Sequence, residues 1–291
     1  MEQLVYSIAD ISLCIKAPYK LDISRESVPF IQTERWECDE QILISQAEFL
    51  PPMDRNGIWH QDRYYVSTDV HENTYFRLTA EEKPYAWIAY GQNGPIRISY
   101  LPGAVNLLRQ SSHLINMLGL EQLLLRHGGL ILHASLIRWQ GQSILFSAPS
   151  GTGKSTQASL WETHMGAEIL NGDRAGIRYV NGKWTAYGLP YAGSSHIFRN
   201  ESAPIGAIVI LRQGKENVIK QMTPVAALRA LIPEFSAHRW NPGFMNKVLN
   251  IAAELLQEVP VYYLECLPDY GSVQLLRDTL RERESYDYNP G

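Results

Sequence analysis

Hydrophobic and polar positions alternate along the first hundred residues. Several segments rich in Val, Ile, Tyr and Thr show this alternation, which is typical of strands with one buried face. Turn-forming residues separate the segments, among them Pro51, Pro52, Gly57, Pro84 and the stretch 91–94. The pattern predicts strands over residues 4–9, 11–17, 41–47, 63–69, 74–80, 85–90 and 95–101. Together they indicate a small antiparallel β domain, in which no group of catalytic residue types stands out.

Helical spacing replaces the alternation after a Pro-Gly pair at position 102. Over residues 105–127 the apolar side chains recur at the spacing of a helix packed on a core. Gly119 is expected to interrupt this helix, and Gly128 to end it. We therefore predict a boundary near residue 102, between a β-rich domain over 1–102, for recognition or assembly, and a second domain over 103–291.

The second domain begins with a predicted hairpin. Segments 130–139 and 142–148 are separated by only two residues, and strands this close pair antiparallel, because parallel pairing needs a crossover of about a dozen residues. Asn181-Gly182 marks another hairpin, between 167–180 and 183–189. Further strands are predicted over 206–212 and 259–266, and helices over 154–164, 224–231, 244–258 and 271–284. The expected fold is α/β (α+β), with a mixed, largely antiparallel sheet.

A glycine-rich loop connects strand 142–148 to the helix that starts at Lys154. It reads Ala148-Pro-Ser-Gly-Thr-Gly-Lys-Ser, with alanine where the phosphate-loop pattern has its first glycine. In such loops the backbone N–H groups and the helix N-terminus surround phosphates, the lysine reaches the β- and γ-phosphates, and the hydroxyl after it ligates Mg²⁺. A turn without chemical significance is the alternative. The residues expected to bind ATP are Ser150, Gly151, Thr152, Gly153, Lys154, Ser155 and Thr156.

The setting of this loop differs from that of common phosphate-loop proteins. In parallel-sheet NTPases a crossover helix leads to a parallel strand, whereas here hairpins lie on both sides of the loop and its helix. Neither an ATP-binding-cassette signature nor a guanine-reading N-K-x-D motif is recognisable. The pattern therefore argues against a GTPase or a transporter ATPase.

The segment "LILHASLIRWQGQSILFSAPSGTGKSTQASLW", followed by "AEILNGDRAGI", resembles the C-terminal kinase domain of HPr kinase/phosphorylase. The resemblance covers residues 128–190 and, more loosely, 190–285. It implies a phosphoenolpyruvate-carboxykinase-type P-loop fold. In size and in this segment the chain is also similar to bacterial kinases that modify peptides, including lasso-peptide precursors.

The resemblance assigns roles to individual residues. It implies that Lys154 and Ser155 bind phosphate and Mg²⁺, and that His133 lies beside the phosphate loop. Asp173 matches the second of two family aspartates, expected to bind Mg²⁺ and accept the acceptor's proton. Position 172 is glycine where the family has the first aspartate, its expected base. The family's downstream metal-binding glutamate is also missing, with Thr185 near its place, and the C-terminal loop that contacts HPr is not recognisable.

Each of the remaining candidate residues could also have an ordinary structural role. Arg199, in the loop 188–201, is the best candidate for a charge-stabilising arginine, although the loop could equally be a solvated surface loop. Asp173 could be an ordinary turn residue and His133 a buried core residue. Arg174 should point to the opposite face of its strand from Asp173 and form a structural ion pair. Weaker candidates for substrate contacts are His196, Arg239 and Trp240.

Composition narrows the class of protein. The chain has 291 residues, 45% of them hydrophobic, and a net charge of −4, which fits a folded protein and does not recommend nucleic acid as a partner. No apolar run is long enough for a membrane span, and the N-terminus does not resemble a secretory signal. Cys14, Cys38 and Cys266 suit neither a disulfide framework nor a zinc site. We therefore expect a cytoplasmic location.

Three functions remain open at this point. The first is an ATP- and Mg²⁺-dependent kinase that phosphorylates a serine hydroxyl on a peptide or small protein, with Asp173, His133 and Arg199 in catalysis. The second, motivated by Gly172, is a nucleotide-binding sensor or scaffold with weakened catalysis. The third is a kinase for free serine or a related small molecule. The resemblance is also compatible with a homo-oligomer.

Overall fold

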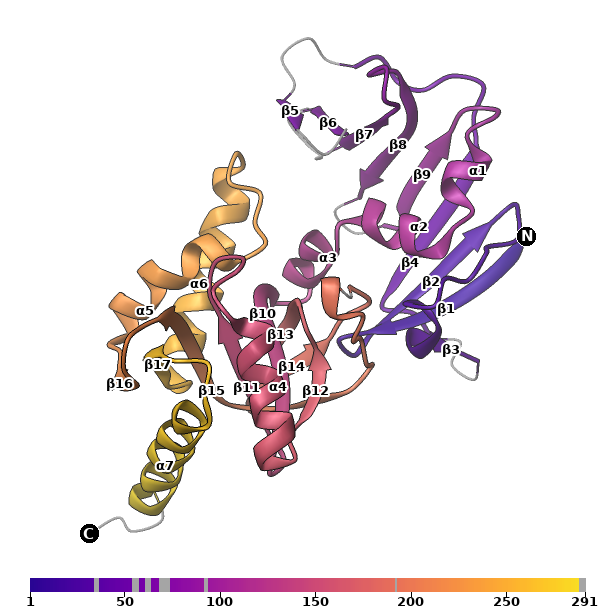
Figure 1. Ribbon diagram of the computed structural model, residues 1–291. Helices are drawn as coiled ribbons and strands as arrows, with labels where there is room; N and C mark the ends of the chain where they lie inside the picture. Colours follow the sequence, from indigo (N-terminus) through magenta and orange to yellow (C-terminus); the bar gives the residue numbers. More distant parts are fainter. Residues whose placement is uncertain are drawn as a thin grey trace. The chain divides into compact units, whose positions relative to one another are not determined.

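The chain folds into two compact units. The structure is a computed structural model that describes residues 1–33, 37–53, 58–60, 64–67, 74–91, 94–191 and 193–287. Its contacts divide the chain into unit 1, Met1–Leu120, and unit 2, Glu121–Gly291. Each unit is built around its own β-sheet (Figure 1).

Unit 1 contains a sheet of nine strands among the described residues, in the order β3-β1-β2-β4-β9-β8-β7-β6-β5. Their bounds are β1 Glu2–Ile8, β2 Ile11–Ala17, β3 Ile31–Gln32, β4 Glu40–Gln46, β5 Ile58–His60, β6 Tyr64–Ser67, β7 Thr74–Leu78, β8 Pro84–Tyr90 and β9 Ile96–Tyr100, with a short 3-10 helix at Val28–Phe30. The predicted strands are confirmed where they are described. Residues 63, 68 and 69, Gly57 and the turn at 92–93 lie outside the described residues.

The antiparallel prediction for unit 1 is wrong at one strand. β4 pairs in parallel with β2 on one side and with β9 on the other. Its connections to both neighbours are long, so they are not hairpins, and a long connection allows two strands to run in the same direction. The sheet of unit 1 is therefore mixed.

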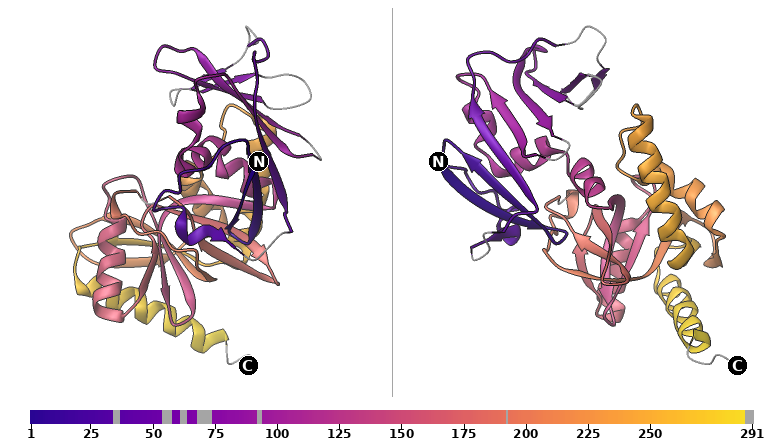
Figure 2. Two further views of the ribbon diagram at one scale, coloured as in Figure 1. Left: turned by 90° about the vertical axis from the view of Figure 1, so that its right-hand side faces the viewer. Right: turned by 180° about the vertical axis from the view of Figure 1, so that it is seen from behind.

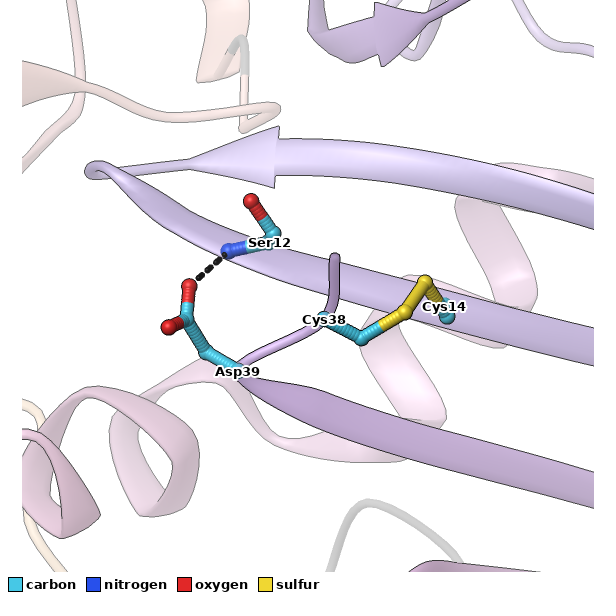
Figure 3. The surroundings of a disulfide bond; sticks show 4 residues. All are labelled: Ser12, Cys14, Cys38 and Asp39. Carbon is cyan, nitrogen blue, oxygen red and sulfur yellow. Dashed lines mark hydrogen bonds between the residues drawn. A yellow bond between two sulfur atoms is a disulfide. The ribbon is translucent and has the colours of Figure 1, made fainter. Parts of the chain in front are cut away.

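A disulfide joins β2 to the residue pair just before β4, which corrects the expectation that the three cysteines do not suit disulfide formation. Cys14 bonds to Cys38, and their Cα atoms are 5.6 Å apart (Figure 3). Asp39 fixes the same corner, because its carboxylate accepts a hydrogen bond from the Ser12 N–H at 2.7 Å. Parallel pairing of β2 with β4 brings the two cysteines together, and sequence spacing alone does not show this pairing. Cysteine usage thus no longer supports a reducing compartment.

The segment expected to be one helix consists of three. These are α1 Val105–Leu108, α2 Ser111–Leu118 and α3 Leu120–Arg126. Gln110 is extended, and Gly119 adopts a left-handed conformation with φ of 62°, so both interrupt the helix. The Ser111 hydroxyl accepts a hydrogen bond from Ser24 N at 2.8 Å, and Arg77 donates to the Asn116 carbonyl at 2.9 Å. These bonds tie α2 to the N-terminal sheet, so the division falls at Leu120 rather than near residue 102.

Unit 2 has a mixed sheet of eight strands among the described residues, as predicted. The order is β11-β10-β13-β14-β15-β17-β16, with β12 on β10 and an additional β11–β15 pairing. The bounds are β10 Gly129–Trp139, β11 Gln142–Ser147, β12 Glu168–Asn171, β13 Arg174–Val180, β14 Lys183–Gly188, β15 Ser202–Gln213, β16 Val218–Gln221 and β17 Val261–Cys266. The two predicted hairpins are present and antiparallel, and β15 runs parallel to β11 and β17.

Helices cover both faces of this sheet (Figure 2). They are α4 Lys154–Met165, α5 Pro224–Leu231, α6 Pro242–Glu258 and α7 Tyr270–Asp287, with 3-10 helices at Gly193–Ser195 and Ile232–Glu234. One core joins Leu132 and Leu145 of the strands to α5 and α6. The other joins Ile144 and Phe146 to α4 and α7, around the fully buried Trp161. None of the described helices is both long and apolar enough to cross a membrane.

Replacing the disulfide should destabilise unit 1. A cross-link of this loop length stabilises a fold by about 2–4 kcal/mol, mainly by restricting the unfolded chain. We expect the Cys14→Ser/Cys38→Ser double variant to lose about this much free energy of unfolding, measured by denaturant titration. Cys266→Ser is the control outside the disulfide. Equal stability of the double variant and the parent, or three titratable thiols in the denatured, unreduced protein, would contradict the assignment.

Candidate functional site

The loop between β11 and α4 has the backbone geometry of an anion site. Gly151 and Gly153 have φ values of 80° and 119°, in the left-handed region that disfavours side chains. Gly153 is the N-cap of α4, and within the described residues no side chain caps this helix start. The first N–H groups of α4 are therefore free to bind an anion, which the positive end of the helix dipole also favours.

Lys154 is held at the base of this loop. Its side chain is largely buried, and its ammonium group donates to the Ala148 carbonyl at 2.7 Å. Burial lowers the pKa of Lys154, while the charges of Glu234 and Asp173 oppose this shift. The Lys154 side chain is thus held in place by the loop itself, and a carboxylate from each of two other segments acts on its charge.

A pocket of about 390 Å³ opens above the loop. It brings together predicted site residues from separate segments: the phosphate loop, β10 and the turn between β12 and β13. The residues that line it are His133, Ser150, Gly151, Gly153, Lys154, Ser155, Thr156, Gly172 and Asp173. The fold therefore brings most of the site residues expected from the sequence into one pocket.

His133 lies between two carboxylates. Its Nε2 is 3.6 Å from Asp173 Oδ1, and its Nδ1 is 3.0 Å from Glu234 Oε2. A hydrogen bond with His133, followed by the nearby positive charges of Arg174 and Lys154, holds the pKa of Asp173 below its usual value against the effect of burial. Asp173 is consequently ionised at neutral pH and faces the phosphate loop.

Sequence analysis missed Glu234. It ends the 3-10 helix after α5, and the next residue, Phe235, forms a bridge with Leu132 of β10. Ser236 N also donates to the Ile131 carbonyl at 2.9 Å. This pairing places Glu234 beside His133 although the two are 101 residues apart in the chain. No local pattern around Glu234 predicts it.

Asn171 positions Asp173 and was also not identified. The buried Asn171 side chain accepts hydrogen bonds from the N–H groups of Asp173 and Arg174, both at 2.9 Å. Its amide nitrogen donates to the carbonyls of Leu189 and Tyr191. An Asn two residues before the Asp is a typical turn pattern, so "NGD" did contain the signal.

Gly172 has no room for a side chain. A Cβ at this position would lie 2.5 Å from the Cβ of Ser195, and the Ser195 hydroxyl would be closer still. Gly193 is equally restricted, since a Cβ there would be 2.7 Å from that of Asp173. The Gly193–Ser195 turn is therefore packed directly against the turn that carries Asp173, and it occupies the space where an aspartate at 172 would begin.

The two arginine candidates lie in different places. Arg199 is 3.5 Å from Glu168 in an ion-pair cluster that also contains Arg138 and Glu201, and it does not line the pocket. Arg174 pairs with Asp173 itself, with 3.5 Å between Nε and Oδ2. The expected ion pair of Arg174 thus exists, but on the side of Asp173 rather than on the opposite face.

The weaker candidates do not join the pocket either. His196 is exposed and has a positive φ of 53°. Arg239 donates to the Pro233 carbonyl at 2.8 Å, and Trp240 stacks on His238 with ring centres 5.4 Å apart. Thr185, near the expected place of a glutamate, donates to the Lys183 carbonyl in β14.

Comparison with known proteins shows the family. The family model described as SynChlorMet cassette protein ScmC matches residues 106–270, which is more than half of the chain. The chain belongs to this family. The region that matches ScmC contains the phosphate loop, His133, Asp173 and Glu234. Among curated proteins, none matches the chain.

A solved structure is also similar to this ScmC family member. It is the Hpr(Ser) kinase/phosphatase from Coxiella burnetii, with 9% sequence identity and a TM-score of 0.31. The likeness covers 54% of this chain and 96% of that chain.

Adding a side chain at position 172 should disrupt the site. We expect Gly172→Ala to lower the free energy of unfolding of unit 2 by about 1–3 kcal/mol, as overpacking does. Ser195→Gly removes the clashing atoms, so the double variant Gly172→Ala/Ser195→Gly should recover most of the loss in a denaturation assay. Gly243→Ala, whose nearest contact would be 3.4 Å away, is the control. Additive effects of the two substitutions would contradict the packing described here.

Asp173 should contribute to stability in a pH-dependent way. Because its pKa is lowered in the folded protein, the ionised carboxylate stabilises the fold above the unfolded-state pKa of about 3.9. This contribution is lost as the pH falls through the lower folded-state pKa. We expect Asp173→Asn to be less stable than the parent at pH 7, and the difference to shrink on acidification toward pH 3. A difference that stays constant with pH would contradict the assignment.

Proposed function

We propose that the protein is an ATP- and Mg²⁺-dependent kinase that phosphorylates a serine hydroxyl of a peptide or small protein. The observation that carries the proposal is the pocket that joins the N-terminus of α4 and Lys154 to Asp173 and His133. One side of this pocket suits phosphate groups, and the other presents an ionised carboxylate to an incoming hydroxyl. Transfer of a phosphoryl group needs this combination of positioning and charge neutralisation.

The triphosphate would bind along the loop. Six loop residues, Ser150, Gly151, Gly153, Lys154, Ser155 and Thr156, line the pocket. The N–H groups at the start of α4 and the Lys154 side chain would contact the β- and γ-phosphates. Ser155 and Asp173 line the same pocket and offer the oxygen ligands that Mg²⁺ prefers. The described residues contain no group of three or more His, Cys, Asp or Glu arranged for a metal. Mg²⁺ bound with a nucleotide needs fewer protein ligands, since phosphate and water oxygens complete its shell.

Asp173 would orient the acceptor hydroxyl and take its proton. In the transfer, the serine oxygen forms a bond to the γ-phosphorus while the bond from this phosphorus to the β–γ bridging oxygen breaks, and ADP leaves. His133 contacts Asp173 with one ring nitrogen and Glu234 with the other, so Glu234 fixes the ring and, through it, the carboxylate. Because position 172 is glycine, Asp173 is the acidic residue in the turn between β12 and β13. A second carboxylate near the pocket comes from another segment, at Glu234.

The nature of the acceptor rests on the sequence resemblance. The resemblance to HPr-kinase-like and peptide-tailoring kinases favours a serine hydroxyl on a peptide or small protein over a small molecule. Unit 1 would then serve recognition or assembly. The family model is described as a cassette protein, and the proteins of a cassette are encoded side by side. The products of the neighbouring genes are therefore the first acceptors to test.

Variants at the site should separate binding from transfer. Lys154→Met should weaken MgATP binding by about 10- to 100-fold, because a charge-assisted hydrogen bond is lost. Asp173→Asn keeps one side-chain oxygen as a ligand for Mg²⁺ but no longer accepts a proton, so it should change MgATP binding less than Lys154→Met does and lower the transfer rate by about 10²- to 10⁴-fold. Binding is measured by calorimetry, and transfer with ³²P-labelled ATP and the neighbouring gene products. The matched controls are Lys183→Met and Asp278→Asn, which make the same changes at exposed positions.

The same assay distinguishes the other functions. Tight MgATP binding without transfer to any acceptor, and an Asp173→Asn variant that behaves like the parent, would contradict the kinase and favour a nucleotide-binding sensor. Transfer to free serine in the absence of any peptide would favour a small-molecule kinase.

Glu234 should act through His133. Glu234→Gln leaves a neutral partner on His133 Nδ1, so we expect a lower kcat with little change in the affinity for MgATP. The loss should be smaller than for Asp173→Asn, because Glu234 does not line the pocket. In the Asp173→Asn background the additional Glu234→Gln substitution should have little further effect. A multiplicative loss in the double variant would show that Glu234 acts independently of Asp173.

A further inference from the structure

Arg174 lies beside two residues of the pocket without lining the pocket itself. It is the first residue of β13 and follows Asp173 directly. In the pairing of β10 with β13 it is opposite His133, and directly opposed residues of antiparallel strands carry their side chains on the same face of the sheet. The strand register therefore brings a positive charge to the two residues proposed to handle the proton of the acceptor.

Two contacts orient the guanidinium group of Arg174. Its Nε is 3.5 Å from Oδ2 of Asp173, and its central carbon is 5.2 Å from the centre of the Tyr191 ring, which is a cation–π distance. Asn171 supports both sides of this arrangement, because it donates to the Tyr191 carbonyl at 2.8 Å and accepts from the Arg174 backbone N–H at 2.9 Å. One buried amide thus holds the ring and the start of the strand that carries the arginine.

The donors of this guanidinium group are not used within the fold. A guanidinium group has five N–H donors, and in the part of the chain that the structure describes the side chain of Arg174 donates no hydrogen bond. The side chain is 41% exposed. Arg138, by contrast, donates to both Glu168 and Glu201 at 2.6 Å. Arg174 is therefore oriented by its neighbours while its donors stay accessible.

The nearby carboxylates already have other partners. The charge of Arg174 also acts on Glu121 of α3, but His238 Nε2 lies 3.0 Å from Oε1 of Glu121. Among the described residues Glu121 forms no ion pair with Arg174. Asp173 faces His133 with its Oδ1, and it approaches Arg174 only at Nε. The two terminal Nη groups thus remain for a ligand from outside the chain.

A carboxylate is the ligand that suits these groups. The planar fork of a guanidinium group binds a carboxylate through two parallel N–H···O bonds. Under the proposed function the acceptor serine meets Asp173, which is 3.5 Å from Arg174. An extended peptide advances about 3.4 Å per residue, so a carboxylate within about three residues of that serine would reach the arginine.

We propose that Arg174 selects the acceptor by binding the side-chain carboxylate of an aspartate or glutamate close to the serine that is phosphorylated. The inference rests on the proposed function, because it names the class of peptide that enters the site. An acidic peptide would be repelled by the triphosphate and by Asp173, and the charge of Arg174 offsets this repulsion at the point where the acceptor meets the base.

The test uses the full chain with Mg²⁺, ³²P-labelled ATP and a library of peptides with blocked ends. Each peptide has a central serine and one fixed Asp, Glu, Asn or Gln within three positions of it. We expect the acid to be preferred over its amide at one position or more by about 10-fold in kcat/KM, the effect of a hydrogen-bonded charge pair.

The outcomes separate this inference from the proposed function. Equal transfer to acids and amides at every position would overturn the inference and leave the kinase standing. If MgATP binds and no peptide in the library is phosphorylated, transfer to peptides fails and the inference fails with it.

Substitution of Arg174 tests the contact itself. We expect Arg174→Gln to abolish the preference for the best acidic peptide over its amide, and Arg174→Lys, which keeps the charge but not the fork, to retain part of it. Any effect through Asp173 or the γ-phosphate would slow both peptides alike and cancel in the ratio. A ratio unchanged in Arg174→Gln would therefore overturn the inference. Arg229→Gln, at an exposed position on α5, is the matched control.

Tyr191 offers a second test, since its ring orients the guanidinium group. Tyr191→Phe keeps a ring for the cation–π contact and should keep the preference for the acidic peptide. Tyr191→Leu removes the ring but leaves the backbone carbonyl that Asn171 binds, and should lower the preference. Equal ratios in the two variants would contradict the orientation of Arg174 described here.

Discussion

The backbone pairing of β10 determines where every residue of the candidate site lies. β10 is hydrogen-bonded to β11 along one edge and to β12 and β13 along the other, and Leu132 also pairs with Phe235. The phosphate loop follows β11, Asp173 lies between β12 and β13, and Glu234 precedes Phe235. His133 is itself on β10. A shift of one residue in this register would turn His133 away from both carboxylates.

The charges in the pocket follow from this arrangement. The charges of Glu234 and Asp173 favour the charged form of Lys154, and His133 contacts the same two carboxylates. These two carboxylates would repel a triphosphate that carries no metal ion. A phosphate loop that has the lysine but no carboxylates nearby would not repel it in this way. A triphosphate that arrives with Mg²⁺ avoids this repulsion, because the cation offsets charge on both the phosphates and Asp173. Under the proposed function, the metal complex of the nucleotide would therefore fit these charges better than the bare anion.

Local patterns in the sequence predicted the parts of unit 2 that depend on neighbouring residues. The hairpin of β10 with β11, the glycine-rich loop, the Asn181-Gly182 turn and the position of Asp173 all belong to this class, because turn chemistry and strand length act within a few residues. Glu234 and the Cys14–Cys38 bond could not be predicted in this way, since each depends on pairing between distant segments. Loop composition favours Arg199 as a site residue, but its ion pairs with Glu168 and Glu201 are tertiary contacts that the sequence does not show. The sequence shows that glycine replaces an aspartate at position 172, but the physical reason, the packing of Ser195, is a tertiary contact.

A triphosphate bound on the α4 loop should present its terminal phosphate to Asp173. A crystal structure of the protein with Mg²⁺ and a non-hydrolysable ATP analogue tests it most directly. We expect the γ-phosphate to lie between Lys154 and Asp173, with Mg²⁺ contacting Ser155 and the Asp173–His133–Glu234 contacts retained. A nucleotide bound away from the loop, or a γ-phosphate directed away from Asp173, would contradict it.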